Sequence, residues 1–259
     1  MNSRENPPPN SSWEHVAKWY DRAVGETGLY YHRNVIIPKL LSLMDLEKEK
    51  EPAVLDLACG QGILSRSLPK RALYLGVDLS KSLITAAKNR SKNPNHQFQV
   101  YNLLNEISLD KNDFTHACLI LALQNMEEVL PVLRTACRHL KKGGKIFLVL
   151  NHPCFRIPRQ SSWQTDLQSK IQYRRIDRYL SPLKIPILAS PSGRSNEKMI
   201  SFHNPISYYI NKLSVAKFVI TGMEEWCSDK TSTGKCAPME NRARKEFPLF
   251  LTITAIKLG

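Results

Sequence analysis

The chain has 259 residues, which suits one large domain or one domain with an insertion. Hydrophobic residues make up 42% and charged residues 23%, ordinary fractions for a globular protein. The longest unbroken apolar run, Ala117 to Leu123, is far too short to span a membrane. Residues 1–12 are polar and lack the apolar stretch of a secretory signal, so we expect a cytoplasmic protein.

The chain is basic. Its 37 Lys and Arg against 23 Asp and Glu give a formal net charge of +14, and residues 151–259 carry +9 of it. Such an excess favours an anionic partner, such as nucleic acid, a membrane surface or an acidic small molecule, although many bacterial proteins are basic without one. The six cysteines form no Cys-x-x-Cys pair and no His cluster accompanies them, so we predict no metal site.

Hydrophobic periodicity predicts alternating helices and strands over the first 150 residues. We expect Ser11-Ser12 to cap the first helix and Pro131 to delay or kink the last one. Lys141 to Gly144 should stop that helix and turn the chain. The expected helices cover residues 13 onward, 31–43, 62–68, 80–89 and 127–140, and the expected strands cover 53–58, 73–77, 97–101, 116–121 and 145–150.

This order predicts an α/β fold, a doubly wound Rossmann-like parallel sheet. Residues 151–204 break the pattern and are rich in Pro, Arg and Ser, so we expect an irregular lid or binding insertion. A helix at 205–216 and strands at 218–223 and 249–257 should follow. We therefore divide the chain into an N-terminal helical segment (1–50), a ligand-binding core (51–150), the insertion (151–204) and a C-terminal part that completes the sheet (205–259).

The strongest motif runs from Val54 to Gly62, where a buried strand enters a turn with two glycines. Gly60 and Gly62 allow positive φ and let a ligand lie against bare backbone. Asp78 ends the next strand, 16 residues after Gly62. In a doubly wound sheet its carboxylate comes beside the glycine turn, where it can accept both hydroxyls of a ribose. The alternatives are a tight turn that binds nothing and an Asp78 that only caps a helix.

A second carboxylate restricts the kind of nucleoside. Dinucleotide enzymes use three spaced glycines, and the third position here is Ser65. Asp56, just before the turn, would repel a pyrophosphate but suits a cationic ligand with an amino group. Both residues disfavour a nicotinamide oxidoreductase and favour S-adenosylmethionine, which carries an ammonium and a sulfonium.

At these residues the chain resembles the class I S-adenosylmethionine-dependent methyltransferases. Asp56 to Gly62 is similar to their first motif, Gly76 to Ser80 to their second, and Leu140 to Ile146 to the turn before their fifth strand. Three other stretches, residues 121–126, 151–158 and 224–228, resemble a largely uncharacterised bacterial subgroup, in which His-Arg-Pro replaces His203-Asn204-Pro205. The resemblance implies a seven-stranded sheet with an antiparallel last strand.

The resemblance also implies roles in binding S-adenosylmethionine. Asp56 would hold the ammonium, Asp78 the ribose, and Asn102 and the Leu103 amide the adenine. Gly60 and Gly62 would pass under the methionine, and the stretch from Leu121 to Gln124 would flank the methyl group. The complete set of expected cofactor-binding residues is Tyr20, Asp56, Ala58, Cys59, Gly60, Gly62, Asp78, Leu79, Asn102, Leu103 and Leu121. For Asn102 a plain turn role, and for Tyr20 a plain core role, are the alternatives.

Catalysis leaves a fainter signal, because methyl transfer depends largely on holding the acceptor in line with the methyl group. His152 follows the fifth strand and is our candidate general base, the alternative being that His152-Pro153 only shapes a turn. We expect His203 to be a capping or surface residue.

The expected acceptor is a small molecule of anionic character, held by a lid over residues 151–183. Arg174 and Arg175 are the centre of its basic residues, and a solvated basic face is the alternative. RNA as the acceptor and a non-catalytic cofactor-binding module remain competing readings, and salt-dependent binding would indicate RNA.

Overall fold

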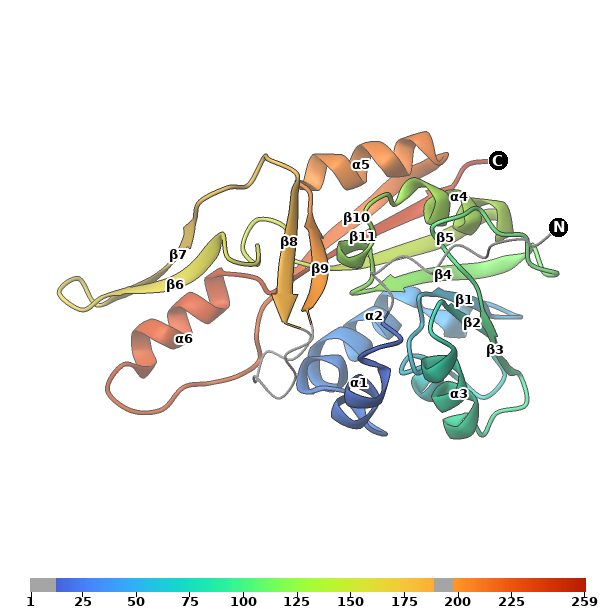
Figure 1. Ribbon diagram of the computed structural model, residues 1–259, viewed down its shortest axis with the longest axis horizontal. Coiled ribbons are helices and arrows are strands. Elements are labelled where there is room, and N and C mark those ends of the chain that lie inside the picture. Colours follow the sequence, from blue (N-terminus) through green and yellow to red (C-terminus); the bar gives the residue numbers. More distant parts are fainter. Residues whose placement is uncertain (1–12, 189–197) are drawn as a thin grey trace, which may run out of the picture.

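The protein is described by a computed structural model that covers residues 13–188 and 198–259, so the predicted Ser11-Ser12 cap lies outside the described residues. Seven strands form the central sheet in the order β10-β11-β5-β4-β1-β2-β3 (Figure 1). They are β1 (Ala53–Leu57), β2 (Leu73–Asp78), β3 (His96–Val100), β4 (Phe114–Ile120), β5 (Leu140–Asn151), β10 (Phe218–Trp226) and β11 (Phe250–Lys257). Only β11 pairs antiparallel, with β5 and with β10. The predicted Rossmann-like sheet with an antiparallel last strand is confirmed.

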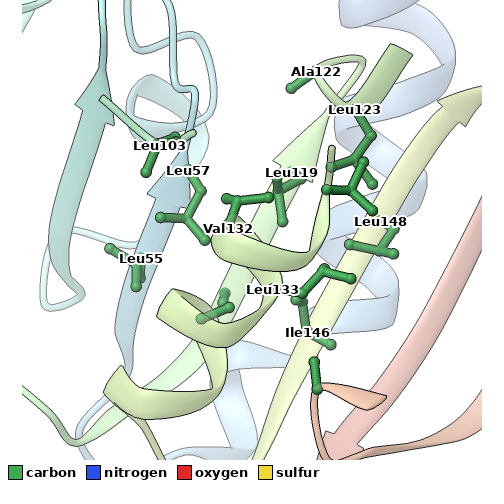
Figure 2. Close-up of a cluster of buried hydrophobic side chains, with 14 of the residues drawn as sticks. Leu55, Leu57, Leu103, Leu119, Ala122, Leu123, Val132, Leu133, Ile146 and Leu148 are labelled. Carbon is green, nitrogen blue, oxygen red and sulfur yellow. The ribbon is translucent and has the colours of Figure 1, made fainter. Parts of the chain in front are cut away.

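Helices cover both faces of the sheet. Helices α4 (Leu130–His139) and α5 (Ile206–Val215) lie on one face, where Leu55, Leu119 and Leu148 of the strands pack against Val132 and Leu133 of α4 (Figure 2). Helices α2 (Ile37–Met44) and α3 (Lys81–Arg90) lie on the other face. Because both faces are covered, the strands have nearly uninterrupted runs of apolar residues rather than an alternating pattern.

The helices predicted at 31–43, 80–89 and 205–216 are confirmed to within one residue at each end. Ser80 caps α3, because its side chain accepts a hydrogen bond from the backbone N–H of Leu83. Pro131 lies in the first turn of α4, which therefore begins at Leu130 rather than at residue 127. Helix α1 (Ala17–Val24) begins later than predicted, after a turn over residues 13–16. A π-helical turn, His32–Ile36, leads directly into α2.

The helix predicted for residues 62–68 is wrong. After the glycine turn the chain forms only a short 3-10 helix, Ser65–Ser67. Leu68 precedes Pro69, and a residue before proline is disfavoured in helical conformation, so Leu68 is extended. The glycine turn is consequently followed by a compact loop.

The turn predicted at Lys141–Gly144 is instead a bulge inside β5. Phe114 pairs with Leu140 and His116 with Lys145, so several residues of β5 oppose the single Thr115 of β4. Gly143, at φ 72°, supplies the left-handed conformation that the bulge requires. Two further differences lie near the C-terminus: β10 extends to Trp226, and helix α6 (Ala237–Glu246) was not predicted.

The insertion is not irregular, as was predicted, but forms two antiparallel hairpins. Strands β6 (Ser161–Asp166) and β7 (Ile171–Ile176) pair, as do β8 (Leu183–Leu188) and β9 (Lys198–His203). The β6–β7 hairpin extends away from the sheet beside α6 (left in Figure 1), whereas β8–β9 stands close to the sheet. Both faces of β6 and β7 are largely exposed, so these strands lack the hydrophobic alternation that identifies a strand in a sequence.

Candidate active site

A cavity of about 390 Å³ lies at the carboxyl ends of β1, β2 and β4. The N-terminal helical segment and the β8–β9 hairpin supply its other walls. Its volume is in the range of small-molecule sites, and its position is the one expected for ligands of open α/β sheets. Ten of the predicted cofactor-binding residues line it: Tyr20, Asp56, Ala58, Cys59, Gly60, Asp78, Leu79, Asn102, Leu103 and Leu121.

Asp56 is a buried carboxylate in the cavity wall. It lies opposite Gly76 on β2, and the absent side chain of Gly76 leaves room for the ring of Tyr74. The Tyr74 hydroxyl donates a hydrogen bond of 2.7 Å to Oδ2 of Asp56. Burial raises the pKa of Asp56 to about 7, although this hydrogen bond lowers it. No Lys or Arg of the described residues pairs with Asp56, so no protein cation neutralises its charge when it ionises.

Asp78 fixes the glycine turn as well as facing the cavity. Its Oδ2 accepts a hydrogen bond of 2.9 Å from the Gly60 N–H, and Oδ1 accepts one of 2.9 Å from the Ser80 N–H. Burial raises the pKa of Asp78, and the two backbone donors lower it. Each oxygen keeps a lone pair for a ligand.

The two glycines of the turn have different roles. Gly60 (φ 55°) lines the cavity, and a Cβ there would lie 3.7 Å from the Tyr20 ring. Gly62 (φ 72°) does not line it: a Cβ there would lie 2.7 Å from the Phe98 ring. Gly62 therefore permits packing of the turn on β3, and the structure does not bring it to the cavity.

The remaining predicted cofactor residues lie at strand ends. The Asn102 Oδ1 accepts a hydrogen bond of 3.0 Å from the Leu104 N–H, so the oxygen predicted to reach adenine already holds the local turn. In the described residues the Leu103 N–H has no such partner. Leu121, like Ala58, lines the cavity at positive φ (52° and 60°), a strained conformation that is concentrated at functional sites.

The N-terminal segment closes one side of the cavity with Trp13, Trp19 and Tyr20. Glu14 ties this segment to α3: it accepts a hydrogen bond of 2.5 Å from the Ser80 hydroxyl and one from the Ser82 hydroxyl. Burial, with the nearby Asp78 charge, raises the pKa of Tyr20, so its hydroxyl stays protonated.

The histidine in the cavity wall is His32, which the sequence analysis missed. Its Nδ1 is buried without a hydrogen-bond partner in the described residues, and burial lowers its pKa to about 4. His32 begins the π-helical turn, a type of distortion frequent at functional sites. No local sequence signal marks it, because a lone His inside a helix usually serves only the core.

His152, the predicted general base, does not line the cavity. Its Nδ1 accepts the Cys154 N–H at 3.1 Å, and its Nε2 lies 2.7 Å from Oε1 of Glu225. Burial lowers its pKa, which the contact with Glu225 raises, and both ring nitrogens are engaged. This arrangement favours the alternative role in shaping the turn. His203, expected to cap or lie on the surface, is instead buried and contacts the Tyr179 carbonyl at 2.7 Å.

Arg174 and Arg175, the predicted centre of the lid, do not line the cavity. Arg174 donates to the Phe155 carbonyl and to Ser161, and Arg175 pairs with Asp177 on the exposed hairpin. Of the described residues of the insertion, Asn151, Pro158, Ile187 and Ser201 line the cavity. The β8–β9 hairpin therefore shares this wall with the first residues of the lid predicted for 151–183.

Residues 54–144 match a family model described as a methyltransferase domain. Over 99 residues the chain is 34% identical to a ubiquinone biosynthesis O-methyltransferase of Coxiella burnetii. The aligned region covers 36% of this chain and 41% of that protein. The chain is 22% identical over 138 residues to a demethylmenaquinone methyltransferase of Staphylococcus aureus, covering 52% and 56%. The chain thus spans about half the length of the curated relatives it matches.

The solved structure of an S-adenosylmethionine-dependent methyltransferase from Mesorhizobium loti is 24% identical and superposes with a TM-score of 0.66, covering 85% of this chain and 96% of that one. The fold and site define a class: the chain has the class I S-adenosylmethionine-dependent methyltransferase fold. Within it, residues 54–144 are the part similar to the methyltransferase-domain family. Among residues 13–188 and 198–259, no helix is long and apolar enough to cross a membrane, and no metal-binding group of His, Cys, Asp or Glu occurs.

Proposed function

We propose that this protein transfers the methyl group of S-adenosylmethionine to a small-molecule acceptor. The observation that carries the proposal is the cavity, whose wall combines the carboxylates of Asp56 and Asp78 with the bare backbone of Gly60. The match of residues 54–144 to a methyltransferase domain supports the reaction. The quinone-biosynthesis names of two relatives support a small acceptor rather than RNA.

The cavity residues fit the cofactor group by group. Asp56 is a buried carboxylate with no cation partner among the described residues, and in its ionised form it would hold the ammonium. The free lone pairs of Asp78 would accept the ribose hydroxyls, as the resemblance implies. The Leu103 N–H would donate to the adenine ring, with Leu79 as an apolar wall. When bound, S-adenosylmethionine supplies an electrophilic methyl group whose leaving group is a neutral thioether.

The chain's own contribution to the reaction is to hold the acceptor in line and dry. Leu121 and Gln124, from the loop after β4, would flank the acceptor, and Ile187 of β8 would exclude water. His32 is neutral at pH 7, because burial lowers its pKa to about 4. The His32 ring would lie against the acceptor, in the place that the sequence analysis gave to His152, while its Nδ1 stays buried within the protein.

The test has a binding and a reaction step. Titration calorimetry should show binding of S-adenosylmethionine and of its demethylated product, S-adenosylhomocysteine, and no binding of NAD. A metabolite extract and a total RNA fraction are then incubated separately with methyl-labelled cofactor and analysed by mass spectrometry. Label in a small molecule supports the proposal, and label only in RNA would replace the acceptor class. Tight NAD binding without S-adenosylmethionine binding would refute the proposed function.

A further inference from the structure

A second, small cavity of about 30 Å³ adjoins the main one at the base of the insertion. Gln124, Asn151, Pro158 and Ser201 line both cavities, so a ligand beside the loop after β4 has direct access to the small one. The small cavity lies beyond the cofactor carboxylates, which line only the main cavity.

The cation of the small cavity is Arg156. Its Nη1 donates to Oδ1 of Asn151 at 2.7 Å, and its guanidinium lies 5.3 Å from the centre of the Phe250 ring. Among the described residues, its one further hydrogen bond is a long one, 3.5 Å from Nη1 to the Leu249 carbonyl. In the part of the chain that the structure describes, Nε and Nη2 donate to no protein group and no carboxylate lies within 4.0 Å of the guanidinium. Two adjacent donors of its planar fork therefore remain for a ligand.

The surroundings do not neutralise this charge. Arg156 is half-buried, and the neighbouring Arg174 adds a second positive charge rather than a carboxylate. His203 also lines the small cavity. Burial lowers its pKa, so its ring is uncharged at neutral pH. A desolvated cation without a counter-ion is costly, and an anionic ligand removes that cost.

We propose that the small cavity is a subsite for a carboxylate of the methyl acceptor, with Arg156 as its counter-ion and Asn151 as the residue that positions the guanidinium. The proposal rests on the proposed function and deepens it. A planar carboxylate matches the two parallel donors of Arg156, and the cavity holds a group of that size but not a larger polyanion. Gln124 lies beside the same ligand, because it lines both cavities.

The test uses matched pairs of carboxylic acids and primary amides, from acetate and acetamide to hydroxybenzoates and hydroxybenzamides. Binding to the full-length protein is measured by calorimetry and thermal shift, with and without saturating S-adenosylhomocysteine. We expect at least one acid to bind tenfold or more tightly than its amide. Arg156→Gln should abolish this preference, Arg156→Lys should retain part of it, and Arg175→Gln on the exposed hairpin should leave it unchanged.

Binding of S-adenosylhomocysteine should be equal in all four proteins, which also shows that the variants are folded. No acid preference anywhere in the panel, or a preference that survives in Arg156→Gln, would overturn the carboxylate subsite. Failure of the wild-type protein to bind S-adenosylhomocysteine while it still prefers acids would refute the proposed function alone.

Discussion

The buried carboxylate of Asp56 predicts a conflict between stability and cofactor binding. Its pKa of about 7 lies well above the ordinary 3.8, chiefly because of burial. In the unfolded chain the group ionises near 3.8, so between pH 3.8 and 7 the native state binds more protons than the unfolded state. The free energy of unfolding therefore falls as the pH rises through this window and is lowest above pH 7. The whole effect is ~4 kcal/mol, at about 1.4 kcal/mol for each unit of pKa.

Asp56→Asn removes this penalty with little change in shape, and the amide oxygen still accepts from Tyr74. Urea denaturation of the ligand-free proteins should show the unfolding free energy of the variant increasing relative to that of the wild type by ~3 kcal/mol from pH 5 to pH 8.5. This is the part of the ~4 kcal/mol effect that falls above pH 5. Tyr74→Phe is the matched control: it removes the hydrogen bond that lowers the Asp56 pKa, so its profile should move to higher pH.

Cofactor binding should change in the opposite direction. The ammonium of S-adenosylhomocysteine needs an ionised Asp56, so wild-type affinity should rise about tenfold per pH unit up to pH 7 and then level off. In Asp56→Asn the affinity at pH 8 should fall by about 1.5–3 kcal/mol, the scale of a hydrogen bond to a charged group, and lose its pH dependence. An Asn variant that is less stable than the wild type at pH 8.5, or that binds with the wild-type pH profile, would refute this reasoning.

Three further predictions concern the turn, the ribose site and a core histidine. Gly62→Ala should lower the unfolding free energy by more than about 2 kcal/mol and Gly60→Ala by about 1 kcal/mol. Both variants strain a positive-φ residue, but only the new Cβ at position 62 collides with Phe98. Equal losses in urea denaturation would contradict the packing role of Gly62. Asp78→Ala should weaken S-adenosylmethionine binding by about 1.5–3 kcal/mol in calorimetry, whereas Asp110→Ala on the surface should leave it unchanged. Equal affinities of the two variants would argue against the ribose contact. Burial lowers the pKa of His116 to about 4, so between pH 6.5 and 4 this group binds more protons in the unfolded chain, and its own contribution to the free energy of unfolding falls by ~3 kcal/mol as the pH drops, opposite in sign to that of Asp56. In urea denaturation His116→Gln should therefore gain ~3 kcal/mol relative to the wild type between pH 6.5 and 4, and a constant difference between the two proteins would contradict this role.

Sequence reasoning succeeded where one short segment determines the structure. The strand from Ala53, the glycine turn and Asp78 form a local unit whose hydrophobicity and turn chemistry specify both the fold and half of the cavity wall. It failed where structure depends on distant partners. Strands β6 and β7 are exposed on both faces, so pairing rather than hydrophobic pattern defines them.

The same limit applies to the site. His32 is 120 residues from His152 in the chain, and only packing decides which of the two reaches the cavity. Arg156 and Arg174 look equivalent in the sequence, yet Arg174 is bound by the Phe155 carbonyl and Arg156 keeps free donors. The contacts of each side chain decide whether it can bind a ligand or only stabilises the fold, and no sequence pattern records these contacts.

Attachment of the N-terminal segment through Glu14 has a kinetic consequence. Trp13, Trp19 and Tyr20 belong to one short piece of chain outside the sheet, and Glu14 fastens it to Ser80 and Ser82 of the helix that follows the ribose carboxylate. Asp21 of the same segment also pairs with Arg90 of α3, so polar contacts between side chains hold this wall to the helix. We expect the time that a product stays bound to depend on these contacts, so that substitutions there change turnover more than they change the thermal stability of the sheet.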